Sequence, residues 1–334
     1  MDKNLNLFFE MLRIDSTSSS ERTFSEFLKK RLDDGKCRIE SFEVGDGTEN
    51  LLFSWGDPEV VFCTHLDTVP PYIPPVMEDG TVKGRGSCDA KGQIFSMYNA
   101  CRTLAEEGET GFALLLLAGE ETGSFGAKSF RTVHPGAPYV IVGEPTDNCM
   151  ASASKGTKSF EITLHGKSAH SGYPECGVSA VELFVDFMQH LRQIDFGTDP
   201  VLGATTYNVG KLESTNPQNV LSDRLSFRLY FRTTFVSDAK VSEVIPGMAN
   251  ETVSVKAFGG DTPTRYLTLD GFPAKPVAFG SDAPQLTNFR SKILCGPGSI
   301  LVAHTPSEHV LLEDLQKAED NYVRMFRILK NSIS

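Results

Sequence analysis

Two adjacent carboxylates follow directly on an apolar stretch of the sequence. Residues 112–126 read FALLLLAGEETGSFG, so a strand-like run leads straight into Glu120 and Glu121. Neighbouring carboxylates repel each other, and the end of a hydrophobic strand is a poor place to solvate them. The pair therefore raises the question of which cation balances the two charges.

Other ionisable residues are placed in a similar way, after two further apolar runs and after the polar run GRGSC. His65 and Asp67 come after VVFCT, Asp89 comes after GRGSC, and Glu144 comes after YVIVG. In open α/β sheets, binding sites form at the carboxyl ends of the strands, so we expect these side chains to converge in one crevice. One or two divalent metal ions would relieve the repulsion of such a cluster. Histidine with carboxylates favours zinc, with cobalt or manganese as alternatives.

Each of these motifs is weak by itself. A lone histidine at a strand end is usually structural, and a lone pair of glutamates is usually a solvated turn. Several such positions, all at predicted strand ends, are hard to attribute to chance, and together they favour a metal site.

The elements that would position these residues alternate between strand and helix. Short apolar runs predict strands, and helical spacing of apolar residues predicts helices. The strands are expected at 60–64, 112–118 and 139–143, and the helices at 91–107 and 124–133. This order is typical of an α/β domain with a mainly parallel sheet and helices on both faces. Two helices precede it, at 3–13 and 21–34, the second with a capping box from Ser18 to Glu21.

The pattern changes after residue 155. Strands are expected at 159–166, 205–213, 223–234 and 252–258, and helices at 174–194 and 237–249. The order strand–helix–strand–strand–helix–strand is that of the split βαβ arrangement, which predicts a small ferredoxin-like α+β domain. We therefore expect a catalytic domain of residues 1–155 and 265–334, completed by a strand at 292–296 and a C-terminal helix, with residues 156–264 inserted.

Composition limits the classes of partner. The chain has 334 residues and a formal net charge of −11, which argues against binding to nucleic acid or to an anionic membrane. No apolar run approaches the roughly 20 residues needed to span a bilayer, and the N-terminus lacks the pattern of a signal peptide. The seven cysteines form no CxxC pair. We interpret them as reduced thiols and expect a cytoplasmic protein.

Six motifs carry a resemblance to a known family. They are THLDTVP (64–70), GRGSCDAKG (84–92), AGEETGSFGAKSF (118–130), GEPTD (143–147), HGKSAHSG (165–172) and GPGSILVAHTPSEHV (296–310). In order and spacing they resemble the motifs of a family of zinc-dependent aminoacylases and carboxypeptidases. That family includes acetylornithine deacetylase and succinyl-diaminopimelate desuccinylase, and the wording is most similar to acetylornithine deacetylase.

The resemblance implies two divalent metal ions and different roles for the two adjacent glutamates. It implies these metal ligands: His65, Asp89, Glu121, Glu144 and His304. Asp89 would bridge the ions, and Glu121 would bind one of them. Glu120 would be the general base that takes a proton from water and passes it to the leaving nitrogen. Asp67 would orient the imidazole of His65.

The resemblance also assigns the inserted domain a role as a lid and dimerisation domain. It implies a homodimer in which His170 reaches into the partner's active site. Asn219 and Arg232 match positions that contact the substrate, and Arg232 would offer a bidentate fork to its α-carboxylate. Residues 261–284 receive no firm role, although GSDAP (280–284) stands where related deacylases have a substrate-side loop, with Ser281 and Asp282 as candidates.

The expected reaction is hydrolysis of a small N-acyl amino acid. The first candidate substrate is N-acetyl-ornithine or a related N-acyl basic amino acid, which would place the enzyme in amino-acid and arginine biosynthesis. The alternatives are removal of succinyl from N-succinyl-diaminopimelate or N-succinyl-ornithine, or a dipeptidase or carboxypeptidase activity. A non-catalytic binding relative is a more remote alternative, because the expected ligands and the base are all present.

Overall fold

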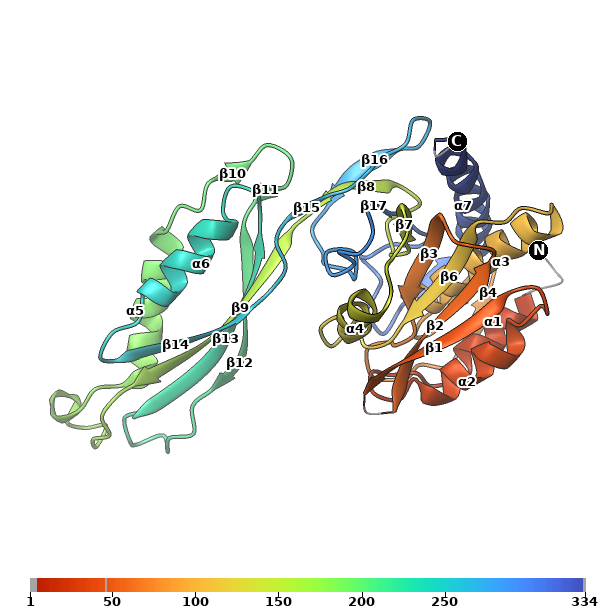
Figure 1. The fold of residues 1–334 in the computed structure, drawn as a ribbon. Helices are drawn as coiled ribbons and strands as arrows, with labels where there is room; N and C mark the ends of the chain where they lie inside the picture. Colours follow the sequence, from red (N-terminus) through yellow and green to blue (C-terminus); the bar gives the residue numbers. More distant parts are fainter. Residues whose placement is uncertain (1–4, 46, 333–334) are drawn as a thin grey trace. The chain divides into compact units, whose positions relative to one another are not determined.

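The computed structural model describes residues 5–45 and 47–332 (Figure 1). The chain divides into two compact units, and each is described by itself. The first holds residues 1–152, 266–275 and 281–334, and the second holds residues 153–265 and 276–280. The boundaries expected from sequence placed residues 153–155, 265 and 276–280 in the first domain, whereas the structure assigns these short segments to the second unit.

The first unit is built on a six-stranded sheet with a parallel centre. The strands, in spatial order, are β1 (Arg38–Gly45), β2 (Thr48–Trp55), β6 (Phe112–Leu117), β3 (Val60–His65), β7 (Tyr139–Val142) and β17 (Ser291–Leu294). Strands β6, β3, β7 and β17 are parallel, whereas β2 runs antiparallel to β6 and β1 antiparallel to β2. The prediction of a mainly parallel sheet is confirmed, but β1 and β2 were not predicted.

Helices cover both faces of this sheet. One face carries α1 (Leu5–Leu12), α2 (Arg22–Arg31), α3 (Lys91–Glu106) and α7 (Leu312–Asn331), which share one buried core with the sheet. In that core the ring of Phe62 meets the ring of Tyr322 edge-on, with centroids 5.9 Å apart. On the other face lies α4 (Phe125–Val133), whose Phe130 packs edge-on against Phe42 of β1. Apolar side chains alternate between the two faces because successive strand residues point to opposite sides.

The second unit is a four-stranded antiparallel sheet with two helices (Figure 1). Its elements, in chain order, are β9 (Gly156–His165), α5 (Ala180–Gln193), β12 (Thr206–Glu213), β13 (Arg224–Thr233), α6 (Asp238–Gly247) and β14 (Val253–Gly259). The strands lie in the order β12-β13-β9-β14, and both helices contribute buried residues to one core with the sheet. The predicted split βαβ arrangement is confirmed.

Short strand pairs tie distant segments together. A three-stranded sheet contains β15 (Thr264–Arg265), β8 (Met150–Ser154) and β16 (Ala274–Val277), and another contains β18 (His309–Leu311), β5 (Thr81–Lys83) and β4 (Val76–Glu78). The second unit has one further short pair, β10 (Thr198–Asp199) with β11 (Gly203–Ala204). The pairing of β18 with β5 places residues 309–311 beside residues 81–83.

Two local predictions were wrong. Helix α2 begins after Glu21, which is its N-cap and forms no capping hydrogen bond through its side chain, so the expected capping box is absent. The Ser18 hydroxyl instead donates to Asp67 at 2.8 Å. The helix expected at 174–194 begins only at Ala180, capped by Ser179, after a single turn of 3-10 helix at Pro174–Cys176.

Two global expectations can be compared with the structure. All seven cysteines lie in described residues, and none is in a disulfide. Among the described residues, no helix combines the length and the apolar character needed to cross a bilayer.

Candidate active site

Three neighbouring parallel strands end at one place in the first unit. Strand β3 lies between β6 and β7, and the register sets His65, its last residue, beside Leu117, the last residue of β6. Glu120 follows β6 after a short turn, and Glu144 follows β7 two residues after its end. The carboxyl ends of parallel strands share one edge of a sheet, which is why residues so far apart in sequence converge here.

The carboxylate of Asp89 lies between two histidines. Its Oδ1 is 3.0 Å from Nε2 of His65, and its Oδ2 is 3.3 Å from Nε2 of His304. The same nitrogen of His304 lies 2.9 Å from Oε1 of Glu121. His65, Asp89 and Glu121 each offer a ligand atom within 4.8 Å of the others. Adjacent ligands of a tetrahedral zinc ion with bonds of 2.0–2.1 Å are about 3.3 Å apart, so these separations fit ligands around a metal.

His304 is held in an uncommon backbone conformation. Its φ of 63° lies in the left-handed region, which non-glycine residues rarely adopt and which is frequent at functional sites. In this conformation the ring of His304 lies beside Asp89 and Glu121. The structure thus brings His65, Asp89, Glu121 and His304 into one cluster. Glu144 interacts with the same cluster through its charge, chiefly with Asp89.

The electrostatics of the cluster favour a bound cation. Burial, and then the neighbouring carboxylates, raise the pKa of Glu144 well above its usual range. Burial is also the largest cause of the raised pKa of Glu120. Hydrogen bonds with Asp89 and Glu121 raise the pKa of His304 to about 10. Each shift means that the site favours added positive charge, and a divalent ion satisfies the same demand.

Asp67 connects His65 to the loop that carries the two glutamates. The backbone carbonyl of Asp67 accepts a hydrogen bond from Nδ1 of His65 at 2.9 Å, and its carboxylate oxygen Oδ1 lies 3.4 Å from the same nitrogen. Because a carbonyl can only accept, Nδ1 carries a proton, and Nε2, the nitrogen that faces Asp89, is the one that could bind a metal ion. The carboxylate accepts the backbone N–H groups of Glu120 and Glu121 at 3.0 and 3.2 Å.

Asp67 therefore contacts His65 as expected, but mainly through its backbone. Its buried carboxylate has a second task that the sequence analysis missed, which is to hold the turn that carries both glutamates. Another buried carboxylate, Asp282, raises the pKa of both Glu120 and Glu144 by repulsion. From the sequence it was only a candidate residue of a substrate-side loop, and its proximity to the two glutamates was not predicted.

Asn50 of β2 fixes the start of the same turn. Its side chain is fully buried, and it accepts from the N–H of Ala118 at 3.0 Å and donates to the carbonyl of Gly126 at 2.9 Å. A Cβ at Gly126 would lie only 2.5 Å from the carbonyl oxygen of Ala118, so glycine is required for this close approach. Asn50 thus joins the end of β6 to the first turn of α4, on either side of Glu120 and Glu121.

We expect Asn50→Ala to destabilise the protein by about 2–4 kcal/mol, because it leaves a buried donor and a buried acceptor without partners. The free energy of unfolding in urea measures the effect. Asn331→Ala, at an exposed position near the end of α7, is the control and should change the value by no more than about 0.5 kcal/mol. Equal values for the two variants would contradict the role given to Asn50.

The remaining predicted site residues lie in the second unit. His170 is exposed, and its Nδ1 accepts a hydrogen bond from the N–H of Gly172 at 3.1 Å, so the neutral ring carries its proton on Nε2. The backbone of Asn219 lies beside this segment, since its carbonyl accepts the N–H of Ser171 at 3.0 Å. Arg232 is half-buried on β13, with its guanidinium 5.0 Å from the ring centre of Tyr230.

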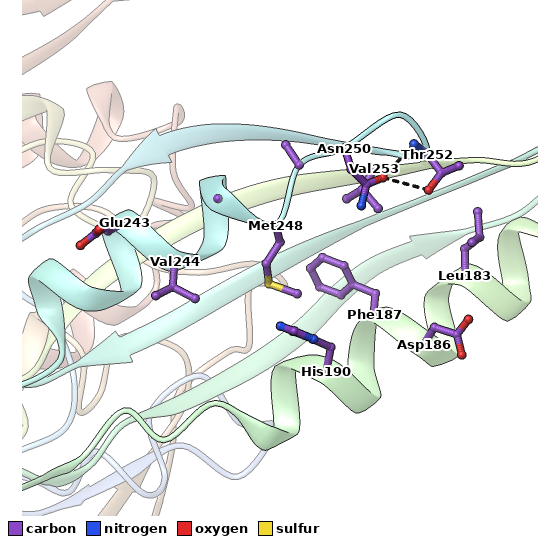
Figure 2. Close-up of a pocket in the computed structure, with 12 residues that line it drawn as sticks. Leu183, Asp186, Phe187, His190, Glu243, Val244, Met248, Asn250, Thr252 and Val253 are labelled. Atoms are coloured by element: carbon purple, nitrogen blue, oxygen red, sulfur yellow. Dashed lines mark hydrogen bonds between the residues drawn. The ribbon is translucent and has the colours of Figure 1, made fainter.

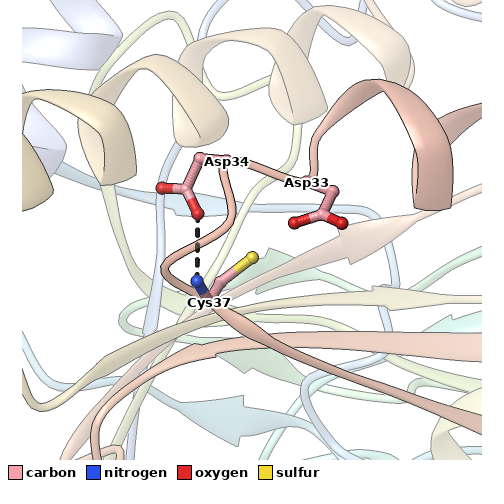
Figure 3. A group of neighbouring side chains, drawn as sticks. All are labelled: Asp33, Asp34 and Cys37. Atoms are coloured by element: carbon pink, nitrogen blue, oxygen red, sulfur yellow. Dashed lines mark hydrogen bonds between the residues drawn. The ribbon is translucent and has the colours of Figure 1, made fainter.

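A second group of potential metal ligands contains Asp33, Asp34 and Cys37 (Figure 3). The carboxylate of Asp34 accepts the backbone N–H groups of Lys36 and Cys37 and the indole N–H of Trp55. Burial raises the pKa of the Cys37 thiol to about 11, so it stays protonated. These contacts account for the group as the frame of a tight turn before β1.

The second unit has a groove of about 770 Å³ between α5, α6 and the start of β14 (Figure 2). Its floor is apolar, with Phe187, Met248 and Val253, and Asp186 and Glu243 lie at its rim. None of the residues predicted to be functional lines it.

The fold and the site define a class of protein, an α/β protein whose sheet carries, at its carboxyl edge, a cluster of carboxylates and histidines that could hold metal ions. Residues 61–327 match the model of Peptidase family M20/M25/M40. The chain is 31% identical to a peptidase M20 domain-containing protein of Schizosaccharomyces pombe, over 97% of this chain and 84% of the relative. The chain therefore belongs to this peptidase family and is a hydrolase of the M20 type.

Other similar proteins carry several names. A protein of Aspergillus flavus named as a probable carboxypeptidase is 29% identical over 94% of this chain and 87% of its own length. Among solved structures, the aminopeptidase PepT of Bacillus cereus shares the fold, with a TM-score of 0.81, 21% identity and 98% coverage of both chains. A Bacillus subtilis protein described as a dinuclear metal binding peptidase of the M20 family has a TM-score of 0.72 at 12% identity, again with 98% coverage of both.

Proposed function

We propose that this protein is a metal-dependent amide hydrolase that cleaves the amide bond of small N-acyl amino acids. The observation that carries the proposal is the carboxylate of Asp89, whose two oxygens face His65 and His304 from opposite sides. A carboxylate so placed suits two metal positions. His65 and Glu144 would complete one, and Glu121 and His304 the other.

The donor set of histidine nitrogens and carboxylate oxygens fits zinc, with cobalt or manganese as alternatives. When bound, such ions lower the pKa of water and polarise a carbonyl oxygen. The remaining chemistry falls to the side chain of Glu120, which is held beside the cluster by the hydrogen bond from its own N–H to Asp67. We assign to Glu120 the transfer of a proton from the attacking water to the departing amine nitrogen.

The second unit would supply substrate contacts from two copies of the chain. The pairing of β13 with β9 sets Arg224 beside His165 at one end of the sheet and Arg232 near the other end. Eight residues separate the two arginines, which is roughly 26 Å of strand. His170 lies in the segment that leaves β9 at this first end, and Asn219 lies in the segment that leads into β13 there. The two segments are hydrogen-bonded to each other.

Because a small N-acyl amino acid cannot span that length, Arg232 and His170 of one chain would not contact the same substrate molecule. The proposal is therefore a homodimer in which Arg232 binds the substrate carboxylate in its own active site, and His170 of the second copy donates to the developing oxyanion. Asn219 would accompany His170.

Mixing two inactive variants tests this arrangement. His170→Ala and Glu120→Gln should each lose activity in homodimers, but a heterodimer contains one site with both residues intact. After subunit exchange of an equal mixture, we expect about a quarter of the wild-type activity, since about half the dimers are mixed and half their sites are complete. If the subunits are shown to exchange and no activity returns, the trans arrangement is contradicted. A monomer with full activity would contradict it as well.

A carboxypeptidase or dipeptidase is the second candidate function, and the name of the Aspergillus flavus relative favours it. An N-acyl amino acid and a dipeptide both present an amide bond next to a free α-carboxylate, so one site chemistry serves either. N-acetyl-ornithine stays a specific candidate because the sequence motifs resemble those of acetylornithine deacetylase. None of the similar proteins named for this chain is an acetylornithine deacetylase.

A panel of substrates separates these candidates. Amine release by the zinc- or cobalt-loaded protein is compared for N-acetyl-ornithine, N-succinyl-ornithine, N-succinyl-diaminopimelate and several dipeptides. Preference for an acyl amino acid supports an acylase and identifies its acyl group, whereas preference for dipeptides supports the second candidate. Absence of turnover on every member would contradict the proposed function.

A further inference from the structure

Glu308 is a fully buried carboxylate that binds the loop preceding Asp89. Its Oε1 accepts the backbone N–H groups of Gly86, Cys88 and Asp89, at 2.9, 3.2 and 3.1 Å. Its Oε2 accepts a hydrogen bond from the guanidinium of Arg85, which is also buried. More than 200 residues of chain separate Glu308 from these partners.

These contacts engage both oxygens of the carboxylate. Three N–H donors converge on one oxygen and a buried cation pairs with the other, so both oxygens of Glu308 are already engaged in binding the protein. Any effect of Glu308 on the site must therefore come from the backbone and side chains that it holds in place. The charge of Arg85 and the three backbone dipoles offset part of the cost of burying the carboxylate, and burial still raises its pKa.

The position of Glu308 in the chain lets it connect two segments of the site, the loop that carries Asp89 and the turn that carries His304. It lies four residues after His304 and directly before β18, whose pairing with β5 runs alongside the start of the Asp89 loop. The backbone carbonyl of Glu308 also accepts the N–H of Gly84 at 3.0 Å. One residue thus joins the loop that carries Asp89 to the turn that carries His304.

We propose that Glu308 is a positioning residue that fixes the spacing between Asp89 and His304, and thereby sets the affinity of the metal position that these two share with Glu121. This inference rests on the proposed function, because it assumes that metal ions bind at these residues. The other position depends less on Glu308, since His65 and Glu144 are held at the ends of β3 and β7.

The test is stepwise zinc binding to the metal-free full-length protein, with the affinity of each step measured by calorimetry. In Glu308→Gln, the amide keeps the size of the side chain but offers one acceptor oxygen and places an NH₂ group among donors. We expect one of the two binding steps to lose about 10- to 100-fold in affinity and the other to change by less than about threefold. Glu313→Gln, at an exposed position in the first turn of α7, is the matched control and should bind as wild type.

Glu308→Asp covers the case in which the glutamine variant does not fold. It keeps the charge and shortens the side chain by one methylene, so a positional role predicts a smaller loss confined to the same step. Unchanged affinities in the aspartate variant, or an equal loss in both steps, would overturn the inference. If the wild-type protein bound no metal ion, the proposed function itself would fail, which is a separate result.

Discussion

Replacing Glu120 with glutamine should lower kcat by about 10³-fold while leaving the metal content unchanged, because the amide cannot accept the proton from water. Steady-state amine release and elemental analysis of the purified variant measure the two quantities. KM should change little, since Glu120 is assigned no part in substrate binding. The variant should also be at least as stable as wild type at pH 7, because burial and the neighbouring Asp282, Glu121 and Asp89 disfavour a charged group at position 120.

The control for this variant is Glu106→Gln, an exposed glutamate on α3 whose kcat should equal that of wild type. A Glu120→Gln protein that retained a tenth or more of the wild-type kcat would exclude Glu120 as the general base. Loss of metal together with activity would instead indicate that Glu120 is a ligand, which would exchange the roles assigned to Glu120 and Glu121.

Replacing Asp89 with asparagine should have the largest effect on metal binding. The side chain would lose the charge and one of the two acceptor oxygens that face His65 and His304. We expect the variant to bind less than one zinc ion per chain under conditions where wild type binds two, and to lose detectable turnover. Equilibrium dialysis with zinc and activity assays on the same sample give both values.

Thermal stability provides a second readout of the Asp89 variant. A ligand present at a thousand times its Kd stabilises the folded state by about 4 kcal/mol, so a chelator should lower the Tm of the wild-type protein by several degrees. The same chelator should leave the Tm of Asp89→Asn almost unchanged. A chelator effect of equal size on the two proteins would show that the ions bind elsewhere.

The sequence was informative where local pattern and chemistry coincide. His65, Glu120 and Glu144 each follow a short apolar run, and such runs are predictable because buried parallel strands are apolar on both faces. The structure places His65, His304 and Glu121 around Asp89, while their roles as metal ligands stay predictions. The alternating strands of the second unit were equally visible, because one face of its sheet packs on helices and the other does not.

The failures have physical reasons of two kinds. Strand β1 is an edge strand with exposed polar residues, and its partner β2 buries Glu49 and Asn50, so neither has the apolar signature of a core strand. The other failures involve long-range hydrogen bonds. Ser18 bonds to Asp67, 49 residues away, in place of the expected cap, and Glu308 bonds to the Asp89 loop. Local spacing cannot reveal such contacts, although the glutamate in AHTPSE was visible as part of a motif.

The most direct test of the account is activity as a function of metal added to the metal-free protein. Amine release from the preferred substrate of the panel should rise with added zinc or cobalt and reach its maximum at two equivalents per chain, and Glu120→Gln should stay inactive at every ratio. Full activity of the metal-free protein in excess chelator, or no amine release from any substrate with two ions bound, would contradict the assignment as a two-metal amide hydrolase.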